Sequence, residues 1–203
     1  MSARVIMVAS GKGGTGKSTV SVLTGAALAA RGRRVLLVEL DSALRSVDYI
    51  AGVYGKTVYD VEDVLCGRCD AGKALVESPL YPGLFVISAP YSGGQVAAGA
   101  LQSFLQQAGG VFDDIVLDTA AGMGAPFEAA RAAASLALIC ITPDPVAQRD
   151  GRIVCDALLE GGCEQVRLVI NKVPRTLAGQ GIRDLDECID TVGAQLLGVV
   201  PYS

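Results

Sequence analysis

The sequence predicts an α/β fold in which a doubly wound, predominantly parallel sheet carries helices on both faces. Short apolar runs alternate with helix-patterned segments, which is typical of βαβ units. Hydrophobic residues make up 51% of the 203 residues and aromatic residues only 5%, a composition that suits helices packed closely on a parallel sheet. Several polar residues follow predicted strands, and open parallel sheets bind their ligands at that edge.

The predicted elements follow one another without an internal repeat or a linker, so we expect residues 1–203 to form a single domain. The predicted strands are residues 5–9, 35–40, 84–88, 115–118, 136–142, 166–170 and 196–200. The predicted helices are residues 18–31, 95–108, 126–134, 146–160 and 184–191. Helices should end at Gly32, Gly109-Gly110 and Gly161-Gly162. Residues 51–83 are expected to hold short helices and turns.

A glycine-rich segment joins the first predicted strand to the first predicted helix. Residues 11–18 match the pattern G-x-x-x-x-G-K-[ST] of a phosphate-binding loop. Glycines let backbone N–H groups surround an anion, Lys17 would reach the β- and γ-phosphates, and Ser18 would bind Mg²⁺. The alternative is that this segment is a glycine-rich turn with no binding function, but the strand–loop–helix context favours a nucleoside triphosphate site. The predicted binding residues are Gly11, Lys12, Gly13, Gly14, Thr15, Gly16, Lys17, Ser18 and Thr19.

Two carboxylates follow predicted strands. Asp41 comes after the second strand and would orient the water that attacks the γ-phosphate, or hold Mg²⁺-bound water; the alternative is that it caps the next helix. Asp118 ends the fourth strand, where phosphate-loop proteins place a carboxylate that supports Mg²⁺. Gly122 would bring its N–H close to the γ-phosphate. The alternative for this segment is an ordinary strand end followed by a turn.

Asn171 follows the sixth predicted strand and is a candidate for binding the nucleotide base. An Asn side chain can pair with N6 and N7 of adenine, whereas Pro174 stands where guanine-binding segments carry Asp, so ATP is favoured over GTP. The alternative is a turn-forming Asn. Lys12 is an extra cation that the loop pattern does not require, and its alternative role is a solvated surface charge.

Composition excludes several classes of protein. The net charge is −4, and no run of Lys or Arg provides a surface for nucleic acid. No apolar run approaches the ~20 residues of a membrane span. The six cysteines suggest reduced thiols in a cytoplasmic protein. Cys66 and Cys69 form a C-x-x-C pair, which supplies too few ligands for zinc but leaves open a cluster shared between two subunits.

The segment K-G-G-T-G-K-S-T at residues 12–19 resembles the deviant Walker A ATPases of the MinD/ParA family. The resemblance extends to residues 37–52, with Asp41, Leu44, Arg45 and Asp48 in register, and to residues 58–69, 118–122, 142–150 and 196–201. Together these segments are most similar to the family's MinD branch, the ATPases that select the cell-division site. The resemblance accounts for Cys69 without a metal, and it places Pro201 near the adenine.

Three positions depart from the family pattern. Glu39 stands where Asp is usual, so its contact with Mg²⁺-bound water is expected to change. Tyr202 replaces an acidic residue. The sequence ends at Ser203, whereas MinD proteins continue to an amphipathic membrane-binding helix. We therefore expect an ATPase domain without that targeting segment, and membrane association only if the natural chain continues beyond Ser203.

The resemblance implies an ATP-dependent dimerisation switch that hydrolyses ATP to ADP and phosphate and positions the division machinery. Lys12 would reach the phosphates bound by a second copy, Lys17 and Asp41 would be catalytic, and Ser18 and Asp118 would hold Mg²⁺. The expected partners are a second copy and a protein that stimulates hydrolysis or is recruited; nucleic acid is not expected. Alternatives are a ParA-like partition carrier, a flagellar-placement ATPase, and a metallocentre-maturation ATPase with a cluster at Cys66 or Cys69.

Overall fold

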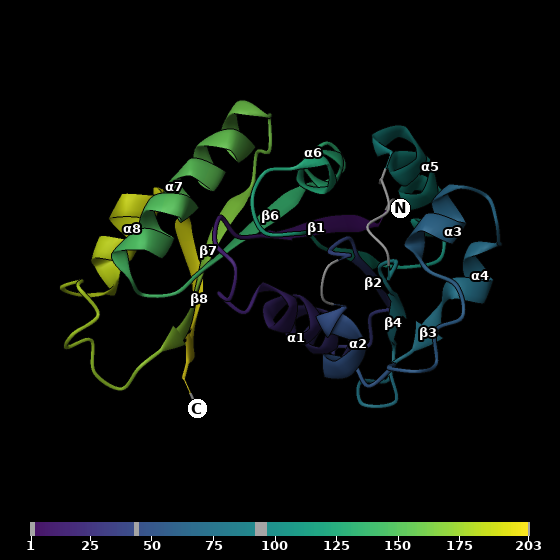
Figure 1. Cartoon of the computed structure of the whole chain (residues 1–203), viewed down its shortest axis with the longest axis horizontal. Helices are drawn as coiled ribbons and strands as arrows, with labels where there is room; N and C mark the ends of the chain where they lie inside the picture. The colour runs from purple at the N-terminus through teal and green to yellow at the C-terminus, as the bar shows by residue number, and fades with distance from the viewer. Residues whose placement is uncertain (1–2, 43–44, 92–96, 203) are drawn as a thin grey trace.

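The computed structural model describes residues 3–42, 45–91 and 97–202, and its centre is an eight-stranded sheet (Figure 1). The strand order is β3-β4-β2-β5-β1-β6-β7-β8. β3 pairs antiparallel with β4, and the other strand pairs that the structure describes are parallel. The strands are β1 (Arg4–Ala9), β2 (Val35–Glu39), β3 (Val76–Glu77), β4 (Leu84–Ile87), β5 (Asp114–Asp118), β6 (Leu136–Ile141), β7 (Val166–Val173) and β8 (Gln195–Pro201).

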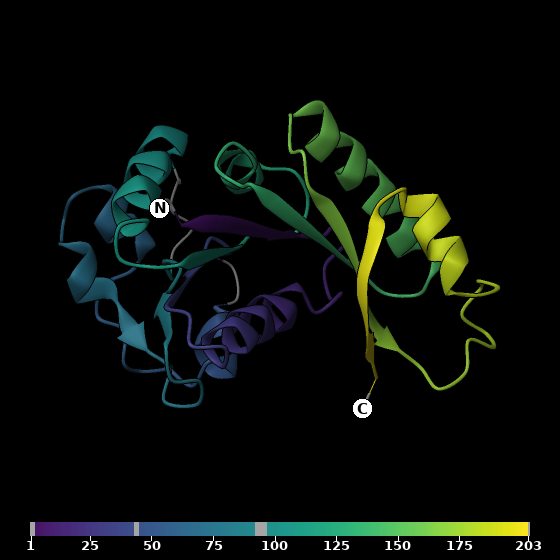
Figure 2. The ribbon, with the colours of Figure 1, turned by 180° about the vertical axis from the view of Figure 1, so that it is seen from behind.

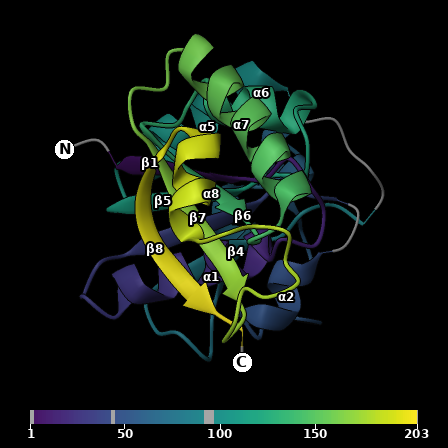
Figure 3. The same cartoon turned by 90° about the vertical axis from the view of Figure 1, so that its left-hand side faces the viewer.

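Helices cover both faces of the sheet, as predicted. They are α1 (Lys17–Ala29), α2 (Ser46–Ile50), α3 (Val61–Leu65), α4 (Ala71–Ala74), α5 (Ala98–Ala108), α6 (Ala125–Arg131), α7 (Pro145–Glu160) and α8 (Leu185–Val192). Figures 1 and 2 show α1 and α2 on one face and α5, α6, α7 and α8 on the other. Figure 3 looks onto the sheet edge formed by β8, with α7 and α8 beside it.

The two faces are packed by alternate residues of the same strands. In β1, Ile6 and Val8 join the core beneath α1, whereas Met7 and Ala9 join the core beneath α5, α6 and α7. This alternation follows from the strand's two-residue period. Because both faces are covered, the central strands consist of continuous apolar runs, which explains why the sequence revealed them clearly.

The seven predicted strands and five predicted helices are all present, with bounds that differ by a few residues. Residues 95–96 of one predicted helix lie outside the described residues, and α5 begins at Ala98. The strand β3 and the helix α2 were not predicted, since two and five residues are too few to show a period. Residues 51–83 hold α3 and α4 as expected, together with β3.

One predicted boundary was wrong in a way that affects the site. β7 continues to Val173, so Asn171 lies within the strand and not after it. The pairing of β7 with β8 shifts register between Ile170 and Val173, which marks an irregularity of the β-bulge kind at this point. A bulge directs side chains away from the regular alternation, and here it lies beside the glycine-rich loop.

The order of the central strands places the functional candidates together. β1 lies next to β5, which lies next to β2. Parallel pairing sets Asp118 opposite both Val8 and Glu39. The loop after β1, the segment after β2 and the segment after β5 therefore leave the sheet at one edge.

Candidate functional site

The glycine-rich loop forms a cavity of about 260 Å³ at the carboxyl edge of the sheet. Most of the predicted binding residues line it, joined by residues from the segments after β2 and β5. The lining residues are Ser10, Lys12, Gly13, Gly14, Thr15, Gly16, Lys17, Ser18, Thr19, Asp41, Ser46, Ile50 and Ala121. Gly11 instead lies against α7, where an added Cβ would approach the Asp150 carbonyl oxygen to 2.6 Å.

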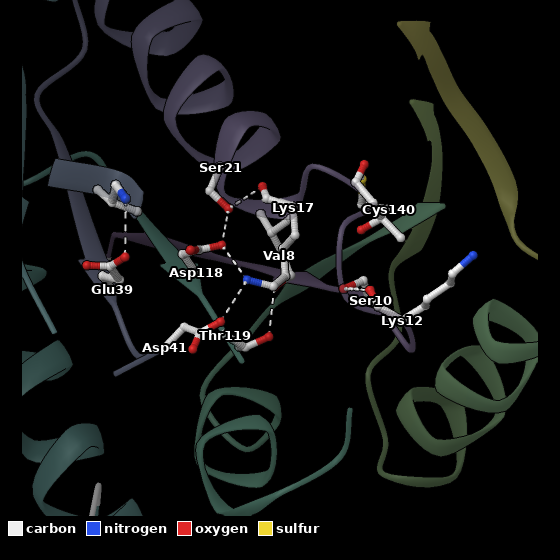
Figure 4. Close-up of polar contacts among 12 residues, drawn as sticks. Val8, Ser10, Lys12, Lys17, Ser21, Glu39, Asp41, Asp118, Thr119 and Cys140 are labelled. Carbon is white, nitrogen blue, oxygen red and sulfur yellow. Dashed lines mark hydrogen bonds and ion pairs between the residues drawn. The ribbon is translucent and has the colours of Figure 1, made fainter. Parts of the chain in front are cut away.

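Lys17 is the central charge of this cavity, as Figure 4 shows. Its ammonium lies 3.1 Å from Asp118 Oδ1 and 3.9 Å from Asp41 Oδ2. Lys17 and Asp118 are both buried. The structure thus brings together three of the predicted residues, two carboxylates and the loop lysine, from three different strand ends.

Ser21 belongs to this cluster although the sequence analysis did not single it out. Its hydroxyl donates to Asp118 Oδ1 over 2.7 Å. Ser21 follows Lys17 by four residues on α1, so both side chains point to the same side of the helix. The four-residue spacing of Lys17 and Ser21 was visible in the sequence. It predicts that both lie on one face of α1, but it does not reveal that β5, which carries Asp118, faces them.

The two carboxylate oxygens of Asp118 differ in their hydrogen bonding. Among the residues that the structure describes, Asp118 Oδ2 and Thr15 Oγ1 are buried side-chain oxygens without a hydrogen bond. Leaving a buried carboxylate oxygen unpaired is unfavourable. Ser18 lines the cavity, and its hydroxyl and the unpaired Asp118 Oδ2 are both oxygen ligands of the kind that Mg²⁺ prefers. The residues present therefore fit the predicted Mg²⁺.

Glu39 lies away from the cavity. Its carboxylate accepts hydrogen bonds from the N–H groups of Val47 (3.2 Å) and Ala89 (3.3 Å). Burial raises the pKa of Glu39 to about 8, with a further contribution from the negative charges of Asp118 and Asp48, while the two N–H groups oppose the shift. Glu39 thus connects the first turn of α2 with the segment after β4 through two hydrogen bonds.

Asp41 lines the cavity and does not cap a helix. The helix that follows it, α2, begins at Ser46, and the residue in the N-cap position is Arg45. Leu44, which was part of the predicted resemblance, lies outside the described residues. Arg45 and Asp48 form a buried ion pair, with 2.7 Å between Arg45 Nη2 and Asp48 Oδ2.

Lys12 lies at the rim of the cavity, and its ammonium points away from Lys17 and Asp118 (Figure 4). Its ammonium is 3.5 Å from Oδ1 of Asp144, the N-cap residue of α7. Burial opposes ionisation of Asp144, but hydrogen bonds from Thr142 and the Ala147 N–H, together with the charge of Lys12, outweigh it and lower its pKa. Lys12 is therefore held by a specific partner and is not a purely solvated charge.

Three further candidates do not line the loop cavity. The Gly122 N–H donates to the Ser10 carbonyl over 3.0 Å, so in this structure it is bonded within the protein and not directed into the cavity. The Asn171 amide donates to the Thr15 carbonyl over 2.8 Å. Pro201 ends β8 opposite Val173 and does not line the loop cavity.

The two cysteines of the C-x-x-C pair differ in exposure. Cys66 is exposed and Cys69 is partly buried against the core. Within residues 3–42, 45–91 and 97–202, no group of three or more Cys, Asp or Glu side chains is arranged to hold a metal ion. The same part of the chain contains no helix with the length and apolarity needed to cross a membrane.

The fold and the site together define a phosphate-loop nucleotide-binding domain. Residues 6–203 match the CobQ/CobB/MinD/ParA nucleotide binding domain. The chain belongs to this family, as a member of the MinD type. Proteins of the MinD/ParA group are nucleotide-binding ATPases.

Relatives and solved structures agree with this placement. The chain is 34% identical to the septum site-determining protein MinD of Synechocystis, over 98% of this chain and 76% of the relative. It is also 34% identical to the MinD protein of Bacillus subtilis, over 96% of this chain and 75% of the relative. Its fold is similar to a chain of the MinC:MinD cell division protein complex of Aquifex aeolicus, with a TM-score of 0.89, 29% identity, and coverage of 99% and 82% of the two chains.

Proposed function

We propose that residues 1–203 form one ATPase domain that acts as an ATP-driven dimerisation switch and takes part in placing the division septum. The similarity to septum site-determining proteins at 34% identity supports the biological role. The observation that carries the mechanism is the separation of two lysines. Lys17 lies within the cavity beside Asp118, whereas Lys12 extends from its rim to Asp144.

The cavity residues can bind ATP and direct its hydrolysis. Loop N–H groups and Lys17 hold the phosphates, and Ser18 with Asp118 holds Mg²⁺. When bound, Mg²⁺ neutralises charge on the β- and γ-phosphate oxygens. Asp41, 3.9 Å from the Lys17 ammonium, orients the attacking water. Asn171 and Pro201 are proposed to lie beside the adenine.

Two contacts seen here would have to break in the active state. Gly122 would exchange the Ser10 carbonyl for a γ-phosphate oxygen, which makes the segment after β5 a sensor of hydrolysis. Lys12 would leave Asp144 and reach the phosphates bound by a second copy, where its charge stabilises the transition state. Loss of these two contacts would make the conformation of the protein depend on the bound nucleotide.

The proposed partners follow from this switch. One is a second copy of the chain, which Lys12 requires in order to act. Another is a protein that is recruited or that stimulates hydrolysis; one similar structure is a MinC:MinD complex. We propose a cytoplasmic location.

The switch can be tested by measuring solution mass by light scattering. Asp41→Ala is expected to slow hydrolysis, so the protein is measured in this background with Mg-ADP and then Mg-ATP. We expect a monomer with ADP and a dimer with ATP. A monomer in both states, with ATP binding confirmed separately, would contradict the dimerisation mechanism. A constitutive dimer that contains iron would favour the cluster-bearing alternative.

The roles of Lys12 and Asp41 are tested by measuring ATP hydrolysis and ATP affinity. Lys12→Ala and Asp41→Ala should each suppress ATP hydrolysis while ATP affinity stays within about tenfold, because neither side chain is the main phosphate ligand. Lys73→Ala removes an exposed lysine of helix α4; this variant serves as the lysine control and should hydrolyse ATP normally. Loss of ATP binding in both test variants would contradict these roles.

A further inference from the structure

The end of β7 has an unusual backbone. Lys172 has a φ of +56°, a left-handed conformation that residues with a side chain rarely adopt. It lies within the register shift between Ile170 and Val173. Such a conformation costs free energy and persists only where the surrounding structure holds the residue in it. The contacts of Lys172 therefore indicate which interactions this backbone conformation allows.

Two neighbouring side chains at this bulge bind the outside of the phosphate loop. The Lys172 ammonium donates to the Gly14 carbonyl over 2.7 Å. The Asn171 amide donates to the Thr15 carbonyl over 2.8 Å. The Lys172 N–H in turn donates to Asn171 Oδ1 over 2.9 Å, which fixes the orientation of the Asn171 amide.

The loop is built to accept this contact. At Gly16, an added Cβ would lie 2.2 Å from Asn171 Nδ2 and 3.7 Å from Lys172 Cε. Gly16 also has a φ of +88°. A side chain at Gly16 would therefore both strain the loop and displace the Asn171 amide.

These contacts have an electrostatic consequence inside the cavity. A donor on a peptide carbonyl polarises that peptide and strengthens the hydrogen bonds of its N–H group. The carbonyl of Gly14 belongs to the same peptide as the Thr15 N–H, and that of Thr15 to the same peptide as the Gly16 N–H. A cation outside the loop thus supports N–H groups of the kind that bind phosphate inside it.

We propose that Lys172 is a positioning residue for nucleotide binding: with Asn171 it holds the outer carbonyls of residues 14 and 15 so that the loop is preorganised for phosphate. This inference rests on the proposed nucleotide site and adds a residue to it. Lys172 does not touch the ligand. Lys172 supports binding of the phosphates, so its effect on affinity should be the same for nucleotides with different bases.

The test compares Lys172→Met, which keeps the length of the side chain without its charge, with Lys172→Arg. We measure the affinities for Mg-ATP, Mg-ADP, Mg-GTP and inorganic tripolyphosphate by titration calorimetry. Lys172→Met should weaken all of them by a similar factor of about three to ten, as expected for an exposed charge-assisted hydrogen bond. Lys172→Arg should restore most of the affinity, and the ratio of ATP to GTP affinity should stay unchanged.

Two further variants separate positioning from folding. Asn adopts the left-handed backbone readily but has no amine. Lys172→Asn should therefore fold normally, and its affinity for tripolyphosphate should be reduced as in Lys172→Met. Arg175→Met removes an exposed cation three residues away and should bind as the wild type does. Wild-type affinity for tripolyphosphate in Lys172→Met and Lys172→Asn would overturn the inference, as would a loss confined to nucleotides that carry a base. If the wild-type protein itself bound no nucleotide, the proposed function would fail first.

Discussion

Lys17 and Asp118 form an ion pair with side-chain exposures of only 7% and 0%, at the point where the phosphates are proposed to bind. Burying such a pair is favourable only when additional hydrogen bonds satisfy the remaining groups. Ser21 supplies one of them to Asp118 Oδ1, and Asp118 Oδ2 has no hydrogen-bond partner among the described residues. The incomplete coordination of Asp118 is what a bound cation or its water would complete.

Glu39 is the second buried carboxylate at this edge, and its pKa makes a prediction about stability. An exposed Glu in the unfolded chain ionises near 4.5, whereas the pKa in the folded protein is about 8. Between these values the unfolded state binds fewer protons than the folded state, so the contribution of Glu39 to stability falls as pH rises from about 4.5 to about 8. Glu39→Gln does not titrate and should become more stable relative to the wild type over this range.

The measurement is the free energy of unfolding in urea at several pH values between 5 and 9, expressed as the difference between the variant and the wild type. Glu77→Gln is the matched control, because Glu77 is exposed and likewise accepts a backbone N–H, from Gly83. The pH dependence found for Glu39→Gln is compared with that of this control. A flat difference for Glu39→Gln would mean that Glu39 is already ionised in the folded protein.

At the scale of helices and strands, the N-cap residue of α7 stabilises its helix and also contacts a residue of the site. Asp144 and Asp184 are the N-caps of α7 and α8, and each accepts a hydrogen bond from an N–H in the first turn of its helix, at 3.0 Å and 2.9 Å. Each Asp therefore makes the same kind of hydrogen bond to its own helix, although Asp144 also accepts one from the Thr142 hydroxyl. They differ because Asp144 also holds Lys12.

This difference predicts two effects that can be separated. Asp144→Ala and Asp184→Ala should each lower the free energy of unfolding by about 1 kcal/mol, the usual effect of losing an N-cap. Only Asp144→Ala should also shift dimer formation to lower ATP concentration, because it releases Lys12 from its contact within the same chain. Urea denaturation and light scattering over an ATP titration measure the two effects. Identical dimerisation in both variants would show that the Lys12–Asp144 contact does not restrain the switch.

At the scale of the whole molecule, the site depends on strands that are far apart in sequence. β1, β2 and β5 lie side by side, and each continues into a segment that reaches the cavity. Two cores, one on each face of the sheet, hold these strands in register. A ligand that contacts several of these segments should stabilise the folded state as a whole.

Nucleotide binding should therefore raise the unfolding temperature. A ligand at a hundred times its dissociation constant stabilises by about 2.7 kcal/mol, which corresponds to about 5–11 °C for a domain of this size. We expect a shift of this order with Mg-ADP. Chelation of Mg²⁺ with EDTA should reduce it, because Asp118 Oδ2 would lose its proposed partner. An equal shift with and without EDTA would contradict the metal role of Ser18 and Asp118.

The phosphate loop, the strands and the fold class could be predicted from the sequence because each is a local pattern. The spacing of Gly11, Lys17 and Ser18 is set within one loop, and the apolar runs reflect strands buried on both faces. Short elements such as α2 and β3 could not be predicted, since neither is long enough for its period to repeat twice. The bulge at Lys172 also had no signal, because it is created by pairing with β8.

The sequence by itself therefore determined the chemical inventory: a phosphate loop, two carboxylates at strand ends and an additional lysine. The tertiary structure decided the partners. It joined Lys17 to Asp118 across 101 residues, Lys12 to Asp144 across 132, and Lys172 to Gly14 across 158. Such contacts depend on strand order and on the direction each side chain leaves the sheet. Those properties arise only when the whole core is packed, and for that reason no local pattern contains them.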